Sequence, residues 1–171
     1  YRRYPCIITL NGAGTTPQQQ IDWWAGAYNS DAQNRFGQAN RHGYIVIASR
    51  SRGAHSKVMT DDVEGLQAQA ADIGFLVAWA NGLPQADTDK IAAMGFSWGG
   101  LANVFAAAGS SRIKALVSLD GSVRSYPERL AEARITPVRT PAPMLSIGAR
   151  SLSIEQFNAK QRSTAVIYLN A

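Results

Sequence analysis

Six short apolar runs, separated by longer segments with helical patterns, most constrain how this chain can fold. Each run is nearly continuously apolar and rich in β-branched residues, which is typical of strands buried on both faces of a sheet. Strands that alternate with helices favour a mostly parallel sheet with helices on both faces, the α/β class. The expected strands are Cys6 to Leu10, Tyr44 to Ala48, Ile91 to Gly95, Ile113 to Leu119, Pro143 to Ile147 and Ala165 to Leu169.

Three segments between these runs have the pattern of helices. The clearest has apolar residues at steps of three and four, and Gly82 and Pro84 end it. A less regular helix is expected from Pro17 towards Phe36, and a short surface helix from Pro127 to Arg134. The apolar positions of the clearest helix are Val63, Leu66, Ala70, Ile73 and Val77.

Length and composition limit the class of protein. The 171 residues predict a single domain, 1–171, able to bury roughly 70% of its unfolded surface. Cys6 is the one cysteine, so an internal disulfide and a cysteine metal cluster are excluded. No apolar run approaches the roughly 20 residues of a membrane span. The net charge is +5, but the basic residues are spread along the chain, so no nucleic-acid partner is expected.

A serine motif stands between the third strand and the next helix. Residues 95–99 read GFSWG and are followed by Gly100, after an apolar run that ends at Met94 and before a helix of small residues that begins near Leu101. This order matches a nucleophile elbow, the strand-to-helix turn that exposes a reactive serine. Ser97 is therefore the candidate nucleophile. The alternative is an ordinary tight turn whose serine caps the helix.

A glycine-rich loop follows the first strand directly. Residues 11–14 read NGAG, and such a turn can aim backbone N–H groups at a developing oxyanion. The expected donors are the backbone N–H groups of Ala13 and Trp98. The alternative is that the glycines only allow the chain to turn from strand to helix.

Together the two motifs resemble the α/β-hydrolase superfamily, with NGAG similar to its His-Gly-type oxyanion loop and GFSWGG to its elbow. The resemblance covers essentially the whole chain and is greatest to the dienelactone-hydrolase and platelet-activating-factor-acetylhydrolase-like branch. It implies hydrolysis of a small-molecule carboxylic ester by a Ser-Asp-His triad, with no cofactor and no metal. Asn11 stands where histidine is usual, which affects the hydrogen bonds that support the loop.

The triad acid has two possible positions in this superfamily. After the strand that follows the elbow helix stands Asp120, with Pro127 shortly beyond it, as in the acetylhydrolase-like enzymes. After the next strand, residues 148–151 contain no carboxylate, and Glu155 comes several residues late. Asp120 is therefore the candidate that orients the base, and the alternative is an ordinary Asp-Gly turn.

The triad base is expected beyond residue 171, after the last strand. His42 precedes the second strand, at the edge of the sheet opposite the elbow, and His55 follows that strand in an order that the superfamily does not use. The superfamily also has strands before the one at Cys6. We therefore expect this chain to be the central segment of a longer hydrolase, without its first strands and its C-terminal end.

Two further expectations concern the substrate pocket and other classes of protein. The residues expected to shape the pocket are Thr15, Trp23, Trp98 and Tyr126. A second class is an NADP-binding reductase, since residues 12–17 nearly match a dinucleotide fingerprint and Arg50 and Arg52 could meet a 2′-phosphate. Pro17 in place of the third glycine argues against it. A third class is a relative that keeps the α/β-hydrolase fold without catalysis.

Overall fold

The computed structural model describes residues 2–12, 15–26, 42–48, 62–121, 126–136, 140, 142–148 and 166–170. Its six strands form one sheet in the order β2-β1-β3-β4-β5-β6, and every pair of neighbours is parallel. The parallel sheet expected from the apolar runs is confirmed. The strands are β1 Tyr4–Leu10, β2 Ile45–Ala48, β3 Ala86–Phe96, β4 Ile113–Leu119, β5 Met144–Gly148 and β6 Val166–Asn170.

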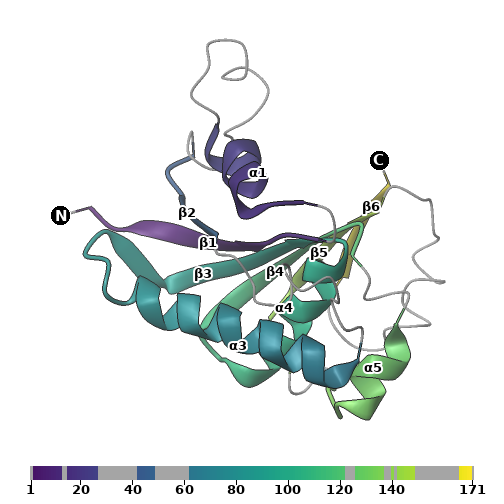
Figure 1. Ribbon diagram of the computed structural model, residues 1–171. Helices are drawn as coiled ribbons and strands as arrows, with labels where there is room; N and C mark the ends of the chain where they lie inside the picture. Colours follow the sequence, from purple (N-terminus) through teal and green to yellow (C-terminus); the bar gives the residue numbers. More distant parts are fainter. Residues whose placement is uncertain are drawn as a thin grey trace.

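Helices cover both faces of this sheet (Figure 1). Helix α1 (Pro17–Ile21), continued by the π-helical turn η1 (Asp22–Gly26), lies on one face. Helices α3 (Val63–Ala80) and α4 (Trp98–Gly109) lie side by side on the other, with α5 (Pro127–Glu132) on their side of the sheet. The regular α-helix ends at Ile21, earlier than expected from the sequence, and residues 27–36 of the expected helix lie outside the described residues.

Local hydrogen bonds explain where α1 and α3 begin. The Thr16 hydroxyl accepts from the Gln19 N–H at 3.2 Å and the Gln19 side chain accepts from the Thr16 N–H at 2.8 Å, which is a capping box, with Pro17 at the first helical position. For α3, the Asp62 carboxylate accepts from the Gly65 N–H at 2.8 Å.

Helix α4 is enclosed on all sides, because it packs against α3, β3 and β4. Apart from Asn103, its buried residues are apolar or glycine, and such a helix is stable only in an enclosed position. Its place directly after β3 makes it the support of whatever stands at the β3–α4 junction. The largest fully buried apolar side chains of the core are Ile8, Leu10, Leu66, Ile73, Ile91 and Leu101.

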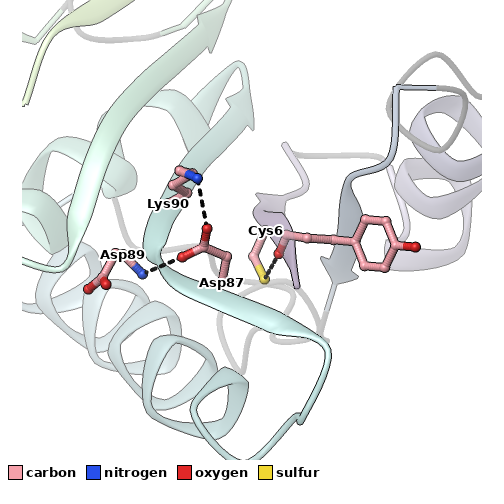
Figure 2. A network of polar contacts seen from close by, with 5 residues as sticks. Cys6, Asp87, Asp89 and Lys90 are labelled. Atoms are coloured by element: carbon pink, nitrogen blue, oxygen red, sulfur yellow. Dashed lines mark hydrogen bonds and ion pairs between the residues drawn. The ribbon is translucent and has the colours of Figure 1, made fainter. Parts of the chain in front are cut away.

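Strand β3 begins five residues earlier than expected, with an irregular polar segment. Ala86 and Asp87 pair with the start of β1, and the register then shifts before Ile91. Figure 2 shows the polar contacts there: Lys90 forms an ion pair with Asp87 at 2.9 Å, and the Asp89 N–H donates to the same carboxylate at 3.3 Å. Hydrogen bonding to Lys90 lowers the pKa of Asp87.

The Cys6 thiol lies beside this segment and donates to the Tyr4 carbonyl at 3.8 Å (Figure 2). Burial, reinforced by the Asp87 carboxylate, raises the pKa of this thiol. An inert, protonated sulfur is expected of such a buried cysteine. The whole network lies at the amino end of β3, whereas Ser97 follows the carboxyl end of that strand. These titratable groups therefore fix the start of two strands and lie away from the serine motif.

The described residues contain neither a helix suited to span a membrane nor a cluster of metal-binding side chains. No helix in this part of the chain combines the length and the apolar character that a membrane span requires. Among the same residues, no group of three or more His, Cys, Asp or Glu side chains is arranged to hold a metal ion.

Candidate active site

Ser97 occupies the turn between β3 and α4 with a backbone conformation that side-chain-bearing residues rarely adopt. Its φ is 52° and its ψ is −118°. The Ser97 N–H donates to the Leu119 carbonyl at 2.9 Å, and its own carbonyl accepts from the Gly100 N–H at 3.0 Å. Ser97 stands at the N-cap position of α4, yet its side chain makes no capping hydrogen bond. The alternative of a helix-capping serine is therefore wrong, and the strained, half-buried residue has the form of an elbow.

The glycines around Ser97 allow three segments of backbone to touch. A Cβ atom at Gly95 would overlap the backbone of Gly99 and Gly100. A Cβ atom at Gly99 would lie 2.6 Å from the Leu10 carbonyl oxygen, closer than real Cβ contacts. The first turn of α4 thus rests directly on the end of β1, which brings the loop after β1 to the elbow.

Gly12, in the predicted oxyanion loop, lies against the serine. A Cβ atom at Gly12 would be 2.7 Å from the Phe96 carbonyl oxygen and 3.0 Å from Ser97 Cβ. Ala13 and Gly14 lie outside the described residues, so the Ala13 donor stays a prediction. Trp98 is the first residue of α4, where backbone N–H groups have no partner within the helix. Its N–H stays the second predicted donor.

The side chain of Asn11 closes this loop. It is 4% exposed, and its Nδ2 donates to the Thr15 carbonyl at 2.8 Å and to the Gly12 carbonyl at 3.3 Å. The Gly12 carbonyl also accepts from the Thr15 hydroxyl at 3.1 Å and from the Thr15 N–H at 3.3 Å. Asn11 thus supplies hydrogen bonds that support the loop in the place where the superfamily usually has histidine. Thr15, predicted to face the substrate, uses its hydroxyl within the loop.

Strand register brings Asp120 level with Ser97. Residues Gly95 and Phe96 of β3 pair with Ser118 and Leu119 of β4, so the residues that follow each strand stand next to each other at one edge of the sheet. Asp120 is exposed, has a φ of 44°, and its N–H donates to the Ile147 carbonyl at 2.6 Å. The predicted nucleophile and the predicted acid therefore share one edge.

Among the described residues, no other candidate for the triad base or acid lies at this edge of the sheet. His42 is exposed in the turn before β2, at the amino end of the parallel strands and so opposite Ser97, as expected from the sequence. His55 and Glu155 lie outside the described residues.

Two aromatic contacts flank the elbow. Trp23 in η1 meets Phe96 edge to face, with ring centroids 6.4 Å apart and an interplanar angle of 82°. Trp98, 7% exposed, meets Tyr126 at 5.5 Å and 80°. Such pairs stabilise their surroundings beyond simple burial. The predicted pocket residues Trp23, Trp98 and Tyr126 thus pack around the motif, and a substrate contact by any of them stays a prediction.

One polar residue that holds the neighbourhood of the site together was not expected from the sequence. Gln20 is 1% exposed, and its Oε1 accepts from the Thr9 hydroxyl at 2.9 Å and from Trp24 Nε1 at 3.3 Å. Nothing in the local sequence distinguishes this buried glutamine from its exposed neighbours Gln18 and Gln19.

The strand order, the elbow and the loop against it define an α/β-hydrolase fold, and solved structures share it. DcsB, determined with a substrate analogue, is 16% identical with a TM-score of 0.66, covering 99% of this chain and 82% of DcsB. The acylaminoacyl peptidase of Pyrococcus horikoshii is 16% identical with a TM-score of 0.65, covering 99% of this chain but 32% of that enzyme. A predicted CIB-like hydrolase from Thermoplasma acidophilum is 16% identical with a TM-score of 0.61, covering 98% of this chain and 75% of that protein.

The family is also shown by sequence. Residues 2–160 match the profile of the family described as X-Pro dipeptidyl-peptidase (S15 family), and the chain belongs to this family. No curated protein matches the chain by sequence. The resemblance to α/β-hydrolases is thus confirmed, whereas the narrower dienelactone-hydrolase branch is not. Membership of a hydrolase family leaves the NADP-binding reductase without support.

Proposed function

We propose that this chain carries the nucleophile of a serine hydrolase that forms an acyl-enzyme on Ser97. The Ser97 hydroxyl attacks the substrate carbonyl, and the backbone N–H groups of Ala13 and Trp98 stabilise the oxyanion. Asp120 orients the histidine that takes the serine proton and passes it to the leaving group. The observation that carries this proposal is the strained backbone of Ser97, with φ 52° and a side chain that makes no capping bond.

For the base we propose a histidine that follows β6, beyond residue 171. Strand β6 pairs in parallel with β5, in the register Ile147↔Leu169 and Gly148↔Asn170. Its carboxyl end therefore lies at the same edge of the sheet as the residues that follow β3 and β4. A loop of ordinary length would bring a side chain from there to the edge.

For the substrate we propose a carboxylic acyl compound, in which the bond that is cleaved is either a peptide bond or an ester bond. The description of the S15 family and the fold shared with an acylaminoacyl peptidase favour a peptide bond. The position of Asp120, after the strand that follows the elbow helix, resembles enzymes that cleave carboxylic esters. Both bonds pass through the same tetrahedral intermediate, so the residues named above serve either reaction. We propose no nucleic-acid partner.

Covalent labelling and paired substrates test this proposal. The complete protein, with the histidine proposed to follow β6, should react with a fluorophosphonate at Ser97, and Ser97→Ala in that protein should lower kcat by roughly 10⁴-fold or more. Ser110→Ala, at the other end of α4, is the matched control and should retain labelling and turnover. Normal turnover by Ser97→Ala would end the serine-hydrolase proposal.

The two bond classes are separated with chromogenic substrates that share one acyl group. An X-Pro p-nitroanilide reports amide cleavage, and the corresponding p-nitrophenyl ester reports ester cleavage. We expect turnover of the anilide if the peptide-bond proposal is correct. Ester turnover with no detectable anilide turnover would favour the ester, and Ser97→Ala should remove either activity.

A further inference from the structure

We infer that Asn11 is a positioning residue that holds the oxyanion loop in its working conformation, acting through the peptide bond between residues 12 and 13. This inference rests on the proposed function and deepens it. Within the part of the chain that the structure describes, the hydrogen bonds of the Asn11 side chain go to Gly12 and Thr15 and not to Ser97, so we place its effect in the loop.

The contacts of Asn11 join the two ends of the loop. One amide group, Nδ2, donates to the Gly12 carbonyl and to the Thr15 carbonyl, at 3.3 Å and 2.8 Å. These bonds use both N–H donors of the side chain. The two bonds thus tie residue 12 to residue 15.

The Gly12 carbonyl is the group through which Asn11 acts on the oxyanion loop. It accepts from Asn11 Nδ2 and from the hydroxyl and the N–H of Thr15, so its direction is fixed by three donors. In a trans peptide bond the C=O and the N–H of the next residue point in opposite directions. Fixing the Gly12 carbonyl therefore fixes the line along which the following N–H points, and that N–H is the proposed Ala13 donor. Gly12 packs against Ser97, so we expect a rotation of this peptide to weaken the oxyanion stabilisation proposed for the Ala13 donor.

The oxygen of the Asn11 side chain takes no part in these contacts. Its Oδ1 is buried without a hydrogen-bond partner among the described residues, which is costly to folding. Rotating the amide would not help, because Oδ1 would then face two carbonyl oxygens. The observed orientation keeps both donors on the loop and leaves the acceptor without a partner among the described residues.

The test compares Asn11→Ala with the similarly sized Asn11→Leu, and neither side chain can donate to the two carbonyls. Both should fold and should lower kcat by about 10-fold to 100-fold, less than the loss of an oxyanion donor itself, with KM changed less than about threefold. The affinity for a peptide or ester trifluoromethyl ketone, which mimics the tetrahedral intermediate, should fall by the same factor as kcat/KM. Asn11→His, which restores one ring N–H donor, should recover part of the loss.

Thr16→Ala is the matched control, because it removes the capping bond of α1 next to the loop and leaves every bond of Asn11 in place. It should lower the melting temperature without lowering kcat. Rates are divided by the concentration of sites that a fluorophosphonate titrates at Ser97. The inference is overturned if kcat per titrated site is unchanged in Asn11→Ala and Asn11→Leu, or if ketone affinity stays at the wild-type value while kcat/KM falls. Absence of Ser97 labelling in the wild type would instead overturn the proposed function.

Discussion

Replacing Ser97 by glycine and by alanine measures the strain at the elbow. Both variants lose the hydroxyl and both should be inactive, so the difference between their stabilities isolates the backbone. Glycine tolerates φ 52° and ψ −118°, whereas alanine must keep the strained conformation. A strained residue of this kind costs on the order of 1–3 kcal/mol. Glycine ordinarily costs about 0.5–1 kcal/mol relative to alanine.

The net expectation is that Ser97→Gly is more stable than Ser97→Ala by about 1 kcal/mol, the difference between those two ranges. For a chain of this size that corresponds to a melting temperature higher by about 2–4 °C. Urea titration followed by circular dichroism gives both free energies of unfolding, provided that the slopes agree.

A pair of variants at Ser110 serves as the control, since Ser110 has φ −144° and ψ 113°, an ordinary extended conformation. There glycine should be less stable than alanine by about 0.5–1 kcal/mol. The sign of the glycine-minus-alanine difference should thus reverse between positions 110 and 97. If glycine is destabilising at both positions to the same extent, Ser97 is not strained and the elbow geometry that carries the proposed function is refuted.

Three further predictions follow from the packing, the register and the charges. Gly99→Ala places a methyl group against the backbone at the end of β1 and should destabilise the protein by about 1–3 kcal/mol in urea titration. Gly74→Ala, in open space within α3, is the control and should stabilise the protein by about 0.5–1 kcal/mol. Equal effects of the two substitutions would contradict the close approach of α4 to β1. Asp120→Asn should lower kcat by on the order of 10³ to 10⁴-fold with little change in fold. If Asp120→Asn leaves kcat nearly unchanged while Glu155→Gln abolishes turnover, Asp120 is not the triad acid. Because the folded-state pKa of Asp87 is lowered, its ion pair stabilises the protein above the ordinary Asp pKa of about 4, and this contribution is lost as the pH falls through the folded-state pKa. The melting temperature should therefore fall less between pH 6 and pH 3 in Asp87→Asn than in the wild type, and identical pH profiles would contradict this contact.

The elements of the fold were largely predictable, because buried parallel strands carry their signal in short contiguous runs of sequence. The range Ile113–Leu119 was predicted as it stands, and the other strands differ mainly at their ends. The start of β3 was missed, since Asp87 and Lys90 are polar residues that pattern alone assigns to a loop. They join the strand only because β1 lies alongside to pair with Ala86 and Asp87.

The sequence by itself determined which reactive and binding groups are present: a serine between glycines at a strand-to-helix turn, and a glycine-rich loop after the first strand. Only the tertiary structure decided which groups meet. Asp120 stands level with Ser97 because β3 and β4 pair in one register, and the loop touches the elbow because Gly12 and Gly99 let backbones approach without a Cβ between them. The role of Asn11 depends on the same approach. Local conformational propensities are set by neighbours along the chain, whereas strand register and backbone contacts are set by packing between segments that are distant in sequence. The serine motif could therefore be predicted from the sequence, and the geometry of the site could not.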